Sequence, residues 1–554
     1  MSAKYSCQIV ADLLARHGVK YVVASPGSRN APLIRAVDEH EELEVLTVVD
    51  ERSAAFRALG MAQVSNAPVA LICTSGTALL NYAPAVSEAY YQRMPLIVVS
   101  ADRPAQWIDQ DDSQTIRQPG ALGNFVKYSC NIPDFSDPEG EMAWYAARCC
   151  NDAMLAALSD SRGPVHVNVQ LGEPLNTDYP QLRNIPYISE VASMPALSFD
   201  AVKTLAEELA GRKVMIVAGF MQPSHTMSKA LGRLAGYDNV VVLTESMANI
   251  HARGLFPCVD RILLQVDKSD EAYRPDVVIT VGGALVSRNL KHYLRSCNRL
   301  EHWSVGLNDT SADVFRHLTK RIKADAGRFL SMLAGALRRE KSNSDYSAAW
   351  QRLRAADEAR HELKLQESPW SSLQAFAEIW PSIPAGTDVQ LSNGTCVRYA
   401  QLFENPGIHS CHCNRGVSGI DGCTSTAAGA SYLYKGDTLL ITGDMSFSYD
   451  LNGLSAPLSP RLKVIVIKNG GGGIFRFIKA TRDFPQRERY LCANLEINAC
   501  GAGELFHFKS LMASSFAELK EVLPWLYAHE GPALLEVVVP ADEDARAIIN
   551  YFEN

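Results

Sequence analysis

The chain has 554 residues, too many for a single hydrophobic core, and this length predicts three domains of ordinary size. Its 53 basic and 61 acidic residues give a formal net charge of −8, so its charge does not favour nucleic acid or an anionic membrane as a partner. No apolar run reaches the roughly 18 residues of a membrane span, and the polar N-terminal segment MSAKYSCQIVADLL lacks the apolar core of a signal peptide. We therefore expect a cytoplasmic protein without stable membrane insertion.

The cysteines indicate reduced thiols. There are 13 of them, an odd number scattered through a long chain, which does not fit a disulfide framework. Cys411 and Cys413 flank His412 and would share one face of a strand, but a zinc site there would need further ligands from elsewhere. Buried thiols are the preferred interpretation.

Apolar runs alternate with helical stretches in the first part of the chain, which is typical of βαβ units and a parallel sheet. The expected strands cover residues 21–24, 45–49, 69–73, 96–100 and 165–169. The second of these, read as residues 43–49, runs directly into an alanine-rich helix. Glu51 then lies at the carboxyl end of a strand and in the first turn of a helix, where an acid stabilises the helix dipole.

Two further α/β patterns follow. A linker rich in Pro, Asn and Ser covers about residues 173–198, and new strands are expected at 214–218, 240–243 and 277–281. A charged helical stretch over residues 325–367, interrupted at 341–345, leads to a third segment that begins near Trp370. A long amphipathic connector suits a domain boundary. The fold class predicted is α/β, with three doubly wound domains around mostly parallel sheets.

The third segment contains the most informative stretch, residues 439–477. It combines a buried strand, a Gly443-Asp444 turn, a helix, a second strand and the glycine run 470–473 after Asn469. If the strands are parallel neighbours, Asp444, Asn469 and the carbonyl of Gly471 meet at their carboxyl ends and supply the oxygen ligands that Mg²⁺ prefers. Each piece alone also fits a structural turn or a flexible loop. No Gly-Lys-Ser/Thr follows the glycines, which argues against a Walker loop.

Several short blocks carry a resemblance to one family. The Gly-Asp pair followed by Asn resembles the thiamine-diphosphate motif. The remaining blocks are SPGSRNAPL at 25–33, DERSA at 50–54, TSGT at 74–77, VSADRP at 99–104, QTIRQPG at 114–120 and NRGVSGIDG at 414–422. Together they resemble the 2-succinyl-5-enolpyruvyl-6-hydroxy-3-cyclohexene-1-carboxylate synthases of menaquinone biosynthesis over essentially the whole chain, most weakly in the middle domain and the last sixty residues.

The resemblance implies an activity and a cofactor. Family members are transferases that decarboxylate 2-oxoglutarate on thiamine diphosphate and add the succinyl group to isochorismate in a 1,4-addition. It implies a pyrimidine-binding domain over 1–180, a central α/β domain over 190–345 and a diphosphate-binding domain over 368–554. Glu51 is then the catalytic carboxylate on the pyrimidine ring. Mg²⁺, for which Mn²⁺ can substitute, is held by Asp444, Asn469 and Gly471, while the cofactor itself also meets Gly443, Ser446 and Ile420.

Both substrates carry two carboxylates, so the site needs local cations despite the acidic chain. Arginine suits this role because its planar fork pairs carboxylates and keeps its charge. Arginines are expected at strand ends and in loops at positions 29, 103, 288, 398 and 415. By the resemblance, Arg398 and Arg415 hold the part derived from 2-oxoglutarate. Isochorismate is met by Ser28, Arg29, Arg103, Gln114 and Arg288, and Ile474 and Phe475 line the substrate pocket.

The chain departs from the family pattern at three places. Ser287-Arg288 stands where a Lys-Arg pair is usual, so one cation is absent from the isochorismate side unless Lys291 replaces it. Gly394 occupies a serine position near the cofactor phosphate, and four glycines follow Asn469 where a more polar run is usual. None of these changes affects Glu51 or Asp444.

Two other readings remain open. An acetolactate-synthase-like carboligase would share the fold and the cofactor but would need fewer carboxylate-binding arginines. A catalytically silent scaffold would keep Val281-Gly282-Gly283 as a vestigial dinucleotide turn; that segment lacks a full G-x-G-x-x-G, so no flavin or nicotinamide cofactor is expected. The superfamily resemblance also implies a homodimer or homotetramer in which Glu51 and Asp444 of one active site come from different subunits.

Overall fold

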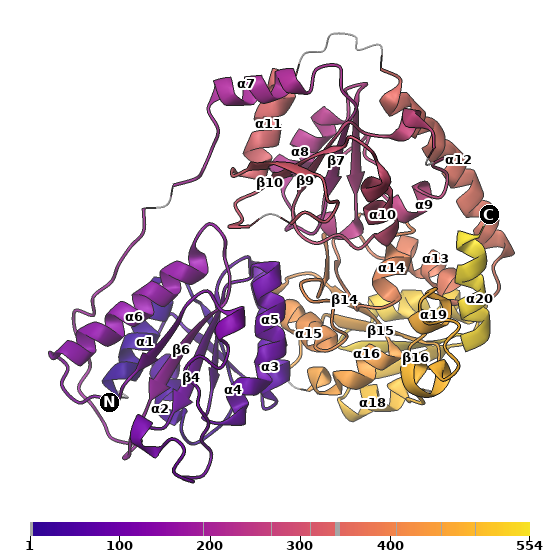
Figure 1. Cartoon of the computed structure of the whole chain (residues 1–554). Helices are drawn as coiled ribbons and strands as arrows, with labels where there is room; N and C mark the ends of the chain where they lie inside the picture. Colours follow the sequence, from indigo (N-terminus) through magenta and orange to yellow (C-terminus); the bar gives the residue numbers. More distant parts are fainter. Residues whose placement is uncertain are drawn as a thin grey trace.

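The computed structural model describes residues 4–553 except 192, 268, 311, 338–343, 406, 456 and 494. Within these residues the chain forms three sheets, each the centre of an α/β domain, and every strand pair is parallel (Figure 1). The first domain, indigo to magenta, lies beside the third, orange to yellow, and the second lies above both. The predicted fold class is confirmed.

The first sheet has the strand order β2-β1-β3-β4-β6-β5. Its strands are β1 (Tyr21–Ala24), β2 (Glu44–Thr47), β3 (Val69–Cys73), β4 (Leu96–Asp102), β5 (Ser129–Ile132) and β6 (Val165–Gln170). Its helices are α1 (Tyr5–Arg16), α2 (Ala31–Asp38), α3 (Glu51–Ser65), α4 (Thr77–Asn81), α5 (Ala83–Gln92) and α6 (Glu141–Leu158). Apolar side chains of α1, α2 and α6 cover one face, and those of α3 and α5 cover the other.

The second strand is shorter than the sequence indicates. We expect a strand over residues 43–49, but β2 ends at Thr47 and Val49 is 75% exposed. The reason is that β2 is an edge strand whose only neighbour, β1, ends at Ala24 opposite Thr47. The residues before Glu51 therefore form a short connection at the carboxyl edge of the sheet.

The second sheet has the order β11-β10-β9-β7-β8. Its strands are β7 (Val214–Ala218), β8 (Val240–Thr244), β9 (Val277–Val281), β10 (Glu301–Val305) and β11 (Leu318–Ile322). Its helices are α7 (Phe199–Glu208), α8 (His225–Leu234), α9 (Val259–Ile262), α10 (Arg288–Ser296) and α11 (Ala326–Ala336). The connector helix α12 (Tyr346–Glu367) packs Tyr346 and Trp350 on this domain, and its His361 hydrogen-bonds the Tyr551 hydroxyl of the third domain at 2.7 Å.

The third sheet, β13-β12-β14-β15-β17-β16, repeats the strand order of the first. Its strands are β12 (Asp388–Leu391), β13 (Ser410–Cys413), β14 (Thr438–Gly443), β15 (Leu462–Lys468), β16 (Lys509–Ala513) and β17 (Ala533–Val538). Its helices are α13 (Ser372–Ser382), α14 (Cys396–Ala400), α15 (Cys423–Leu433), α16 (Asp444–Tyr449), α17 (Ile474–Phe477), α18 (Ala499–Leu505), α19 (Phe516–Ala528) and α20 (Ala541–Phe552). The first and third domains thus share one topology.

Helices α3 and α15 join these two domains at close range, as Figure 1 shows between the two lower domains. A Cβ at Gly60 would lie 1.9 Å from the Thr426 carbonyl oxygen, and one at Gly429 would lie 2.0 Å from the Arg57 carbonyl oxygen. Arg57 is buried and its guanidinium donates to the Gly453 and Pro457 carbonyls at 3.1 and 2.8 Å. Glycine is required here because the two backbones touch.

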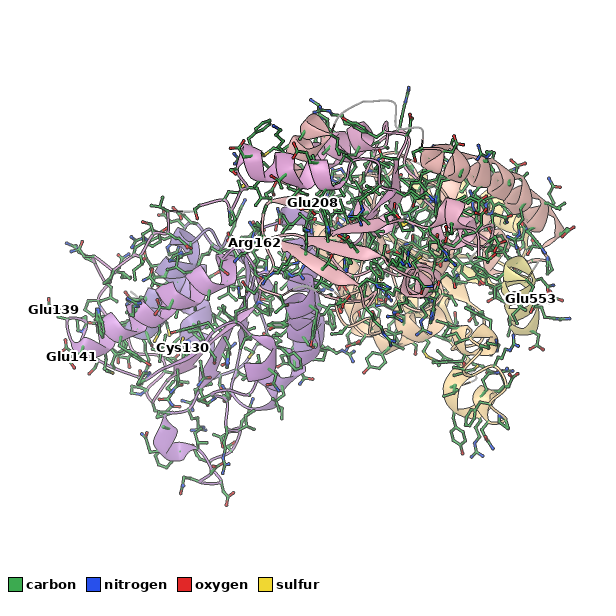
Figure 2. The ribbon with its side chains drawn as sticks, turned by 45° about the horizontal axis from the view of Figure 1, so that its top comes forward. Cys130, Glu139, Glu141, Arg162, Glu208 and Glu553 are labelled. Atoms are coloured by element: carbon green, nitrogen blue, oxygen red, sulfur yellow. The ribbon has the colours of Figure 1, made fainter. Side chains whose placement is uncertain are left out.

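The remaining predictions about the whole chain concern thiols and membranes. All 13 cysteines are free, and Cys411 and Cys413 are buried in β13. Cys130 on the edge strand β5 lies, with Glu139 and Glu141, on the side of the first domain away from the other two (Figure 2). In the described part of the chain, no helix has both the length and the apolar character needed to cross a membrane.

Candidate active site

Polar residues follow four adjacent strands of the first sheet at their carboxyl ends. Ser28 and Arg29 follow β1, Glu51 follows β2, Ser75 follows β3, and Arg103 follows β4. Because neighbouring parallel strands end at the same edge, these residues share one edge of the sheet. That edge includes the switch between β1 and β3, where open α/β sheets bind ligands.

Glu51 begins α3 and is half-buried. The side chain of Asp50 caps the helix by accepting from the Ser53 N–H at 3.2 Å, and it also accepts from Asn452 Nδ2 at 2.6 Å. Arg52 donates to the Tyr449 carbonyl at 3.0 Å. The Glu51 carboxylate itself has no hydrogen-bond or ion-pair partner within the described residues. The flanking residues therefore hold α3 on the third domain and leave this carboxylate available.

The two arginines at this edge are already paired. Arg29 is buried, donates to the Leu171 carbonyl at 2.8 Å and pairs with Glu173 at 3.1 Å. Arg103 pairs with Asp112 at 2.6 Å. A substrate carboxylate would have to exchange with Glu173 or Asp112 at these positions.

Ser28 and Gln114 frame the same edge. Ser28 is exposed. Gln114 Nε2 donates to the Ser75 carbonyl and Ser75 Oγ donates to the Gln114 carbonyl, both at 2.9 Å. This reciprocal pair fastens the loop that carries Gln114 to the end of β3.

Asp444 and the turn at Asn469 come together in the third domain. As the sequence analysis requires, β14 and β15 are parallel neighbours, with Gly443 opposite Ile467. Asp444 is 1% exposed. Its Oδ2 accepts from the backbone N–H groups of Asn469, Gly470 and Gly471 at 3.1, 3.0 and 2.9 Å, and its Oδ1 accepts from Met445 at 2.8 Å. Burial raises the pKa of this carboxyl group, whereas these backbone donors act to lower it.

The amide of Asn469 is held in one orientation. Its Nδ2 donates to Asp544 Oδ2 at 2.9 Å, so its Oδ1 is the oxygen left for a cation. Arg476, which is buried, donates to the carbonyls of Asn469 and Gly470 at 2.9 and 3.2 Å. These two hydrogen bonds hold the backbone of the turn in place. An Asp444 carboxylate oxygen and an oriented amide oxygen fit a hard cation such as Mg²⁺.

The close contacts and positive φ angles of the turn require glycine at several positions of the run 470–473, so this run is not a flexible loop. Gly470 and Gly471 have φ of 78° and 104°, and a Cβ at Gly471 would lie 1.9 Å from the Cys492 carbonyl oxygen. A Cβ at Gly473 would lie 2.3 Å from Asn469 Nδ2. The Gly471 carbonyl, a predicted metal ligand, accepts from the Gly473 N–H at 2.7 Å. Larger side chains would displace the turn or the Asn469 amide.

The other predicted cofactor residues lie beside Asp444. Ser446 is buried, and its hydroxyl donates to the Ile420 carbonyl at 2.7 Å, which brings these two residues together. The Gly443 N–H donates to Ser392 Oγ at 3.2 Å. A Cβ at Gly443 or at Gly394, which has a φ of 98°, would meet nothing within 4 Å. There is therefore open space beside both glycines, near the carboxyl ends of β14 and β12.

Ile474 and Phe475 begin the short helix α17 directly after the glycines, and both are half-buried. They therefore lie next to the Asn469 turn, at the carboxyl edge of β15. Apolar side chains there can line a substrate pocket, as the sequence predicts.

Four cations gather where α10, α14 and the loop after β13 meet. They are Arg288, Lys291, Arg398 and Arg415, and we call them the cation cluster. Burial, together with repulsion from Arg415 and Arg288, lowers the pKa of Arg398. The Nε atoms of Arg398 and Arg415 are buried and have no hydrogen-bond partner in the described part of the chain. These unused guanidinium donors suit carboxylates.

The expectation that Arg288 and Arg398 lie at strand ends or in loops is wrong. Arg288 is the first residue of α10, and Arg398 lies within α14, because β12 ends at Leu391 and the chain turns into that short helix. Arg415 does follow a strand, and it donates to Asn393 Oδ1 at 3.0 Å. Arg288 and Arg398 thus lie on helices of two different domains, and not at strand ends or in loops.

Two buried acids support the start of α10. Glu245 accepts from the N–H groups of Val286 and Ser287 at 2.8 Å each, and burial raises its pKa to about 7. Ser287 caps the helix and donates to Asp260 at 2.6 Å. The unusual Ser287 is therefore a buried capping residue and not a surface substitution.

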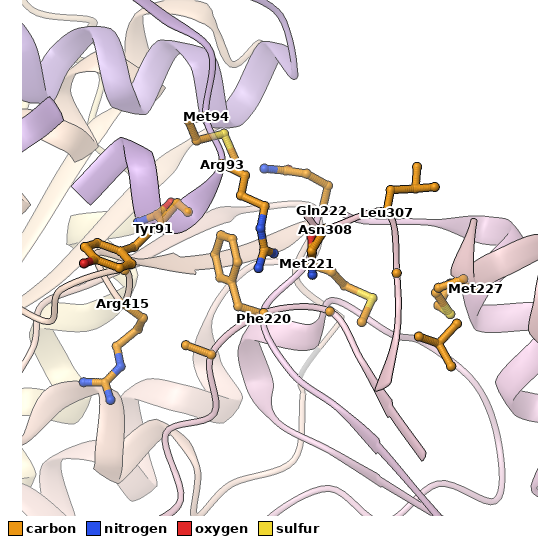
Figure 3. A pocket seen from close by; sticks show the side chains of 18 of the residues that line it. Tyr91, Arg93, Met94, Phe220, Met221, Gln222, Met227, Leu307, Asn308 and Arg415 are labelled. Atoms are coloured by element: carbon orange, nitrogen blue, oxygen red, sulfur yellow. The ribbon is translucent and has the colours of Figure 1, made fainter. Parts of the chain in front are cut away.

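A cavity of about 300 Å³ lies at the junction of the three domains. Figure 3 shows Arg93 and Tyr91 from the first domain, Phe220 and Met221 from the second, and Arg415 from the third around it. Burial lowers the pKa of Arg93. Arg415 lines this cavity and also belongs to the cation cluster, so the cavity opens beside the cluster.

Sequence reasoning missed residues that hold the site together. Glu88 of α5 is 1% exposed and accepts from the N–H groups of Gly416 and Val417 at 2.5 and 2.8 Å, which fixes the loop that carries Arg415. Asp544 lies in the last helix and Arg476 two residues beyond α17's first residue. The sequence around each of these residues contains no motif that predicts its role. Glu88 and Asp544 contact residues far away in the chain, and Arg476 contacts the backbone of the preceding turn.

Comparisons with known proteins agree with this geometry. The family described as "Thiamine pyrophosphate enzyme, N-terminal TPP binding domain" matches residues 6–121, and that described as "Middle domain of thiamine pyrophosphate" matches residues 182–385. The fold, the Asp444–Asn469 turn and these matches define the class: the chain is a thiamine-diphosphate-dependent enzyme.

Full-length relatives narrow the class. The chain is 40% identical to a 2-succinyl-5-enolpyruvyl-6-hydroxy-3-cyclohexene-1-carboxylate synthase of Porphyromonas gingivalis, over 100% of this chain and 97% of the relative. It is 36% identical to the synthase of Christiangramia forsetii, over 98% and 97%, and 34% identical to that of Bacteroides fragilis, over 98% of each chain. The chain belongs to the 2-succinyl-5-enolpyruvyl-6-hydroxy-3-cyclohexene-1-carboxylate synthase family.

Proposed function

We propose that this enzyme decarboxylates 2-oxoglutarate and adds the succinyl group to isochorismate, as a cytoplasmic step of menaquinone biosynthesis. The observation that carries the proposal is the cation cluster, in which the Nε atoms of Arg398 and Arg415 are buried and have no hydrogen-bond partner among the residues that the structure describes. Two dicarboxylate substrates require several cations in one place, whereas a pyruvate-specific carboligase would leave buried guanidinium groups uncompensated.

The third domain supplies the residues for the diphosphate and its metal. Asp444, Asn469 and the Gly471 carbonyl would hold Mg²⁺, with Gly443, Ser446 and Ile420 beside the cofactor. When bound, thiamine diphosphate supplies the nucleophilic carbon and accommodates the electron pair released by decarboxylation. Glu51, whose carboxylate has no hydrogen-bond or ion-pair partner among the described residues, would hold a proton against the pyrimidine ring.

The substrates divide between two sets of residues. Arg398 and Arg415 would bind the carboxylates of 2-oxoglutarate. The acceptor isochorismate would meet Ser28, Arg29, Arg103, Gln114 and Arg288, with Ile474 and Phe475 against its apolar parts. Arg29 would exchange Glu173, whose side chain is 66% exposed, and Arg103 would exchange Asp112, whose side chain is 33% exposed, for substrate carboxylates.

The active site is proposed to form between two subunits of a homodimer or homotetramer. Two apolar side chains next to Glu51 are exposed: Val49, two residues before it, is 75% exposed, and Tyr449, whose carbonyl accepts from Arg52, is 52% exposed. Within one chain, the start of α3 is tied to Tyr449, the last residue of α16, and to Asn452 shortly after it, at the opposite end of α16 from Asp444. A mixture of Glu51→Ala and Asp444→Ala enzymes is expected to recover activity after subunit exchange; no recovery despite proven exchange contradicts the shared site.

Carbon dioxide release tests the reaction. Purified enzyme with thiamine diphosphate and Mg²⁺ is expected to consume 2-oxoglutarate and isochorismate in equal amounts, and Glu51→Ala is expected to do neither. Release from pyruvate but not from 2-oxoglutarate would indicate an acetolactate-synthase-like carboligase. Cofactor binding without turnover of any 2-oxoacid would indicate a silent scaffold.

A further inference from the structure

We propose that Cys130 and Cys149 form an oxidisable pair of thiols, which hydrogen peroxide converts reversibly into a disulfide between β5 and α6. The proposed reaction uses neither thiol, so this inference stands apart from the proposed function. In a reducing compartment such a disulfide is transient and forms only under oxidation.

Packing within the first domain brings the two thiols together. Cys130 lies in the edge strand β5, and Cys149 lies in α6, which packs against that strand. Cys149 belongs to the apolar cluster on this face of the sheet, and Cys130 packs against the same cluster. Cys130 Sγ is 4.0 Å from the Cys149 carbonyl oxygen, and a hydrogen bond joins the two side chains. Both cysteines are free, so the pair consists of two reduced sulfurs in contact.

The surroundings of the pair favour a thiolate on Cys149. The hydrogen bond with Cys130 lowers the pKa of Cys149, and burial acts in the opposite direction. Hydrogen bonds from Tyr145 and Tyr128 lower it further. The same bond between the sulfurs raises the pKa of Cys130, so the pair retains one proton on Cys130 while Cys149 carries the charge. The thiolate is the nucleophilic form of cysteine.

Oxidation of the pair balances with one molecule of hydrogen peroxide. The Cys149 thiolate attacks a peroxide oxygen, an S–O bond forms, and the O–O bond breaks. The departing hydroxide takes the proton of Cys130 and becomes water. The Cys130 thiolate then attacks the Cys149 sulfur, the S–S bond forms, and the S–O bond breaks. The second hydroxide takes a proton from solvent. Two sulfurs lose two electrons in total, and the peroxide is reduced to two molecules of water.

The position of the pair distinguishes it from a core thiol. Cys130 is half-buried at the edge of the sheet, and Tyr145, which hydrogen-bonds Cys149, is 38% exposed. A molecule as small as peroxide therefore has only a short way to travel to Cys149, which is itself 3% exposed. Cys150 follows in the same helix but is an ordinary core thiol, since burial raises its pKa and disfavours the thiolate.

The test treats the reduced full-length enzyme with hydrogen peroxide, alkylates the remaining thiols and identifies linked peptides by mass spectrometry. We expect one predominant link, between Cys130 and Cys149, which dithiothreitol reverses. The link should also raise the urea unfolding midpoint, because it joins residues 19 positions apart and restricts the unfolded chain. Cys149→Ala should lose both the link and the rise. The matched control Cys150→Ala, at the neighbouring position of α6, should keep both.

Three results would overturn the inference. They are the absence of a linked peptide in the oxidised wild type, a predominant link between other cysteines, and loss of the link in a folded Cys150→Ala enzyme. Cys130→Ser gives a second readout that does not depend on the Cys149→Ala enzyme folding. Without the second thiol, Cys149 should stop at the sulfenic acid and be labelled by dimedone, and an unlabelled Cys149 would refute its role as the nucleophile. None of these measurements requires turnover, so failure of the proposed function would leave them unaffected.

Discussion

The contact between α3 and α15 makes a strong prediction about Gly60. Adding one methyl group, Gly60→Ala, places a Cβ 1.9 Å from the Thr426 carbonyl oxygen and 2.8 Å from the Ala430 nitrogen. Ordinary contact begins at 3.4 Å, so the two helices must separate by about 1.5 Å. Both atoms belong to backbone, and no side-chain rotation can relieve the overlap.

The magnitude follows from two opposing effects. Overpacking a tight interface costs up to about 3 kcal/mol, and replacing glycine by alanine within a helix returns about 1 kcal/mol of helix propensity. We expect a net loss of about 2 kcal/mol in the free energy of unfolding. Turnover should fall as well, because Glu51 begins the helix that is displaced.

Urea unfolding followed by far-UV circular dichroism measures the effect. The matched control is Gly335→Ala in α11, where the same methyl group meets nothing within 4 Å. The control should raise the midpoint slightly and leave turnover unchanged, whereas Gly60→Ala should lower the midpoint. Equal midpoints for Gly60→Ala and wild type would refute the claim that backbone contact sets the distance between these domains.

Four further predictions concern single carboxylates. Glu51→Gln should lower turnover at least a hundredfold without changing the unfolding midpoint; near-normal turnover would remove its catalytic role. Asp444→Asn should abolish the rise in melting temperature that thiamine diphosphate with Mg²⁺ gives the wild type, and an equal rise would refute the metal site. Glu88→Gln should raise the KM for 2-oxoglutarate by loosening the loop of Arg415, and an unchanged KM would show that the loop holds itself. The pKa of Glu245, raised by burial to about 7 from 4.5, means that the folded state binds the proton more tightly than the unfolded state does. Stability should therefore fall by about 3 kcal/mol between pH 4.5 and pH 7.5 relative to Glu245→Gln; a difference independent of pH would contradict this.

The sequence was informative where local pattern decides structure. Buried apolar runs predicted β3, β7 and β9 at their observed bounds. The pairing of Asp444 with the turn at Asn469 was also predictable, because a strand, a helix and a second strand in succession form parallel neighbours.

Long-range contacts were not predictable. Nothing near Arg103 in the sequence shows that Asp112 neutralises it, and nothing near Arg398 shows that α10 of another domain brings Arg288 to it. The predicted strand over residues 43–49 was also too long: β2 ends at Thr47, because the length of an edge strand depends on its neighbour in the sheet. These features depend on how separate segments pack, and a single sequence does not contain that information locally.

The bond between Asn469 and Asp544 affects the order in which the site can be made. Asp544 is buried in α20, 75 residues after Asn469, and it also accepts from the Ser372 N–H at 2.7 Å. During synthesis the ribosome releases both halves of the glycine turn well before this carboxylate. The Asn469 amide, which we propose as a metal ligand, is therefore fixed only once the last helix has folded back. A nascent or prematurely ended chain would lack a competent cofactor site, which makes cofactor retention a direct report on completed folding.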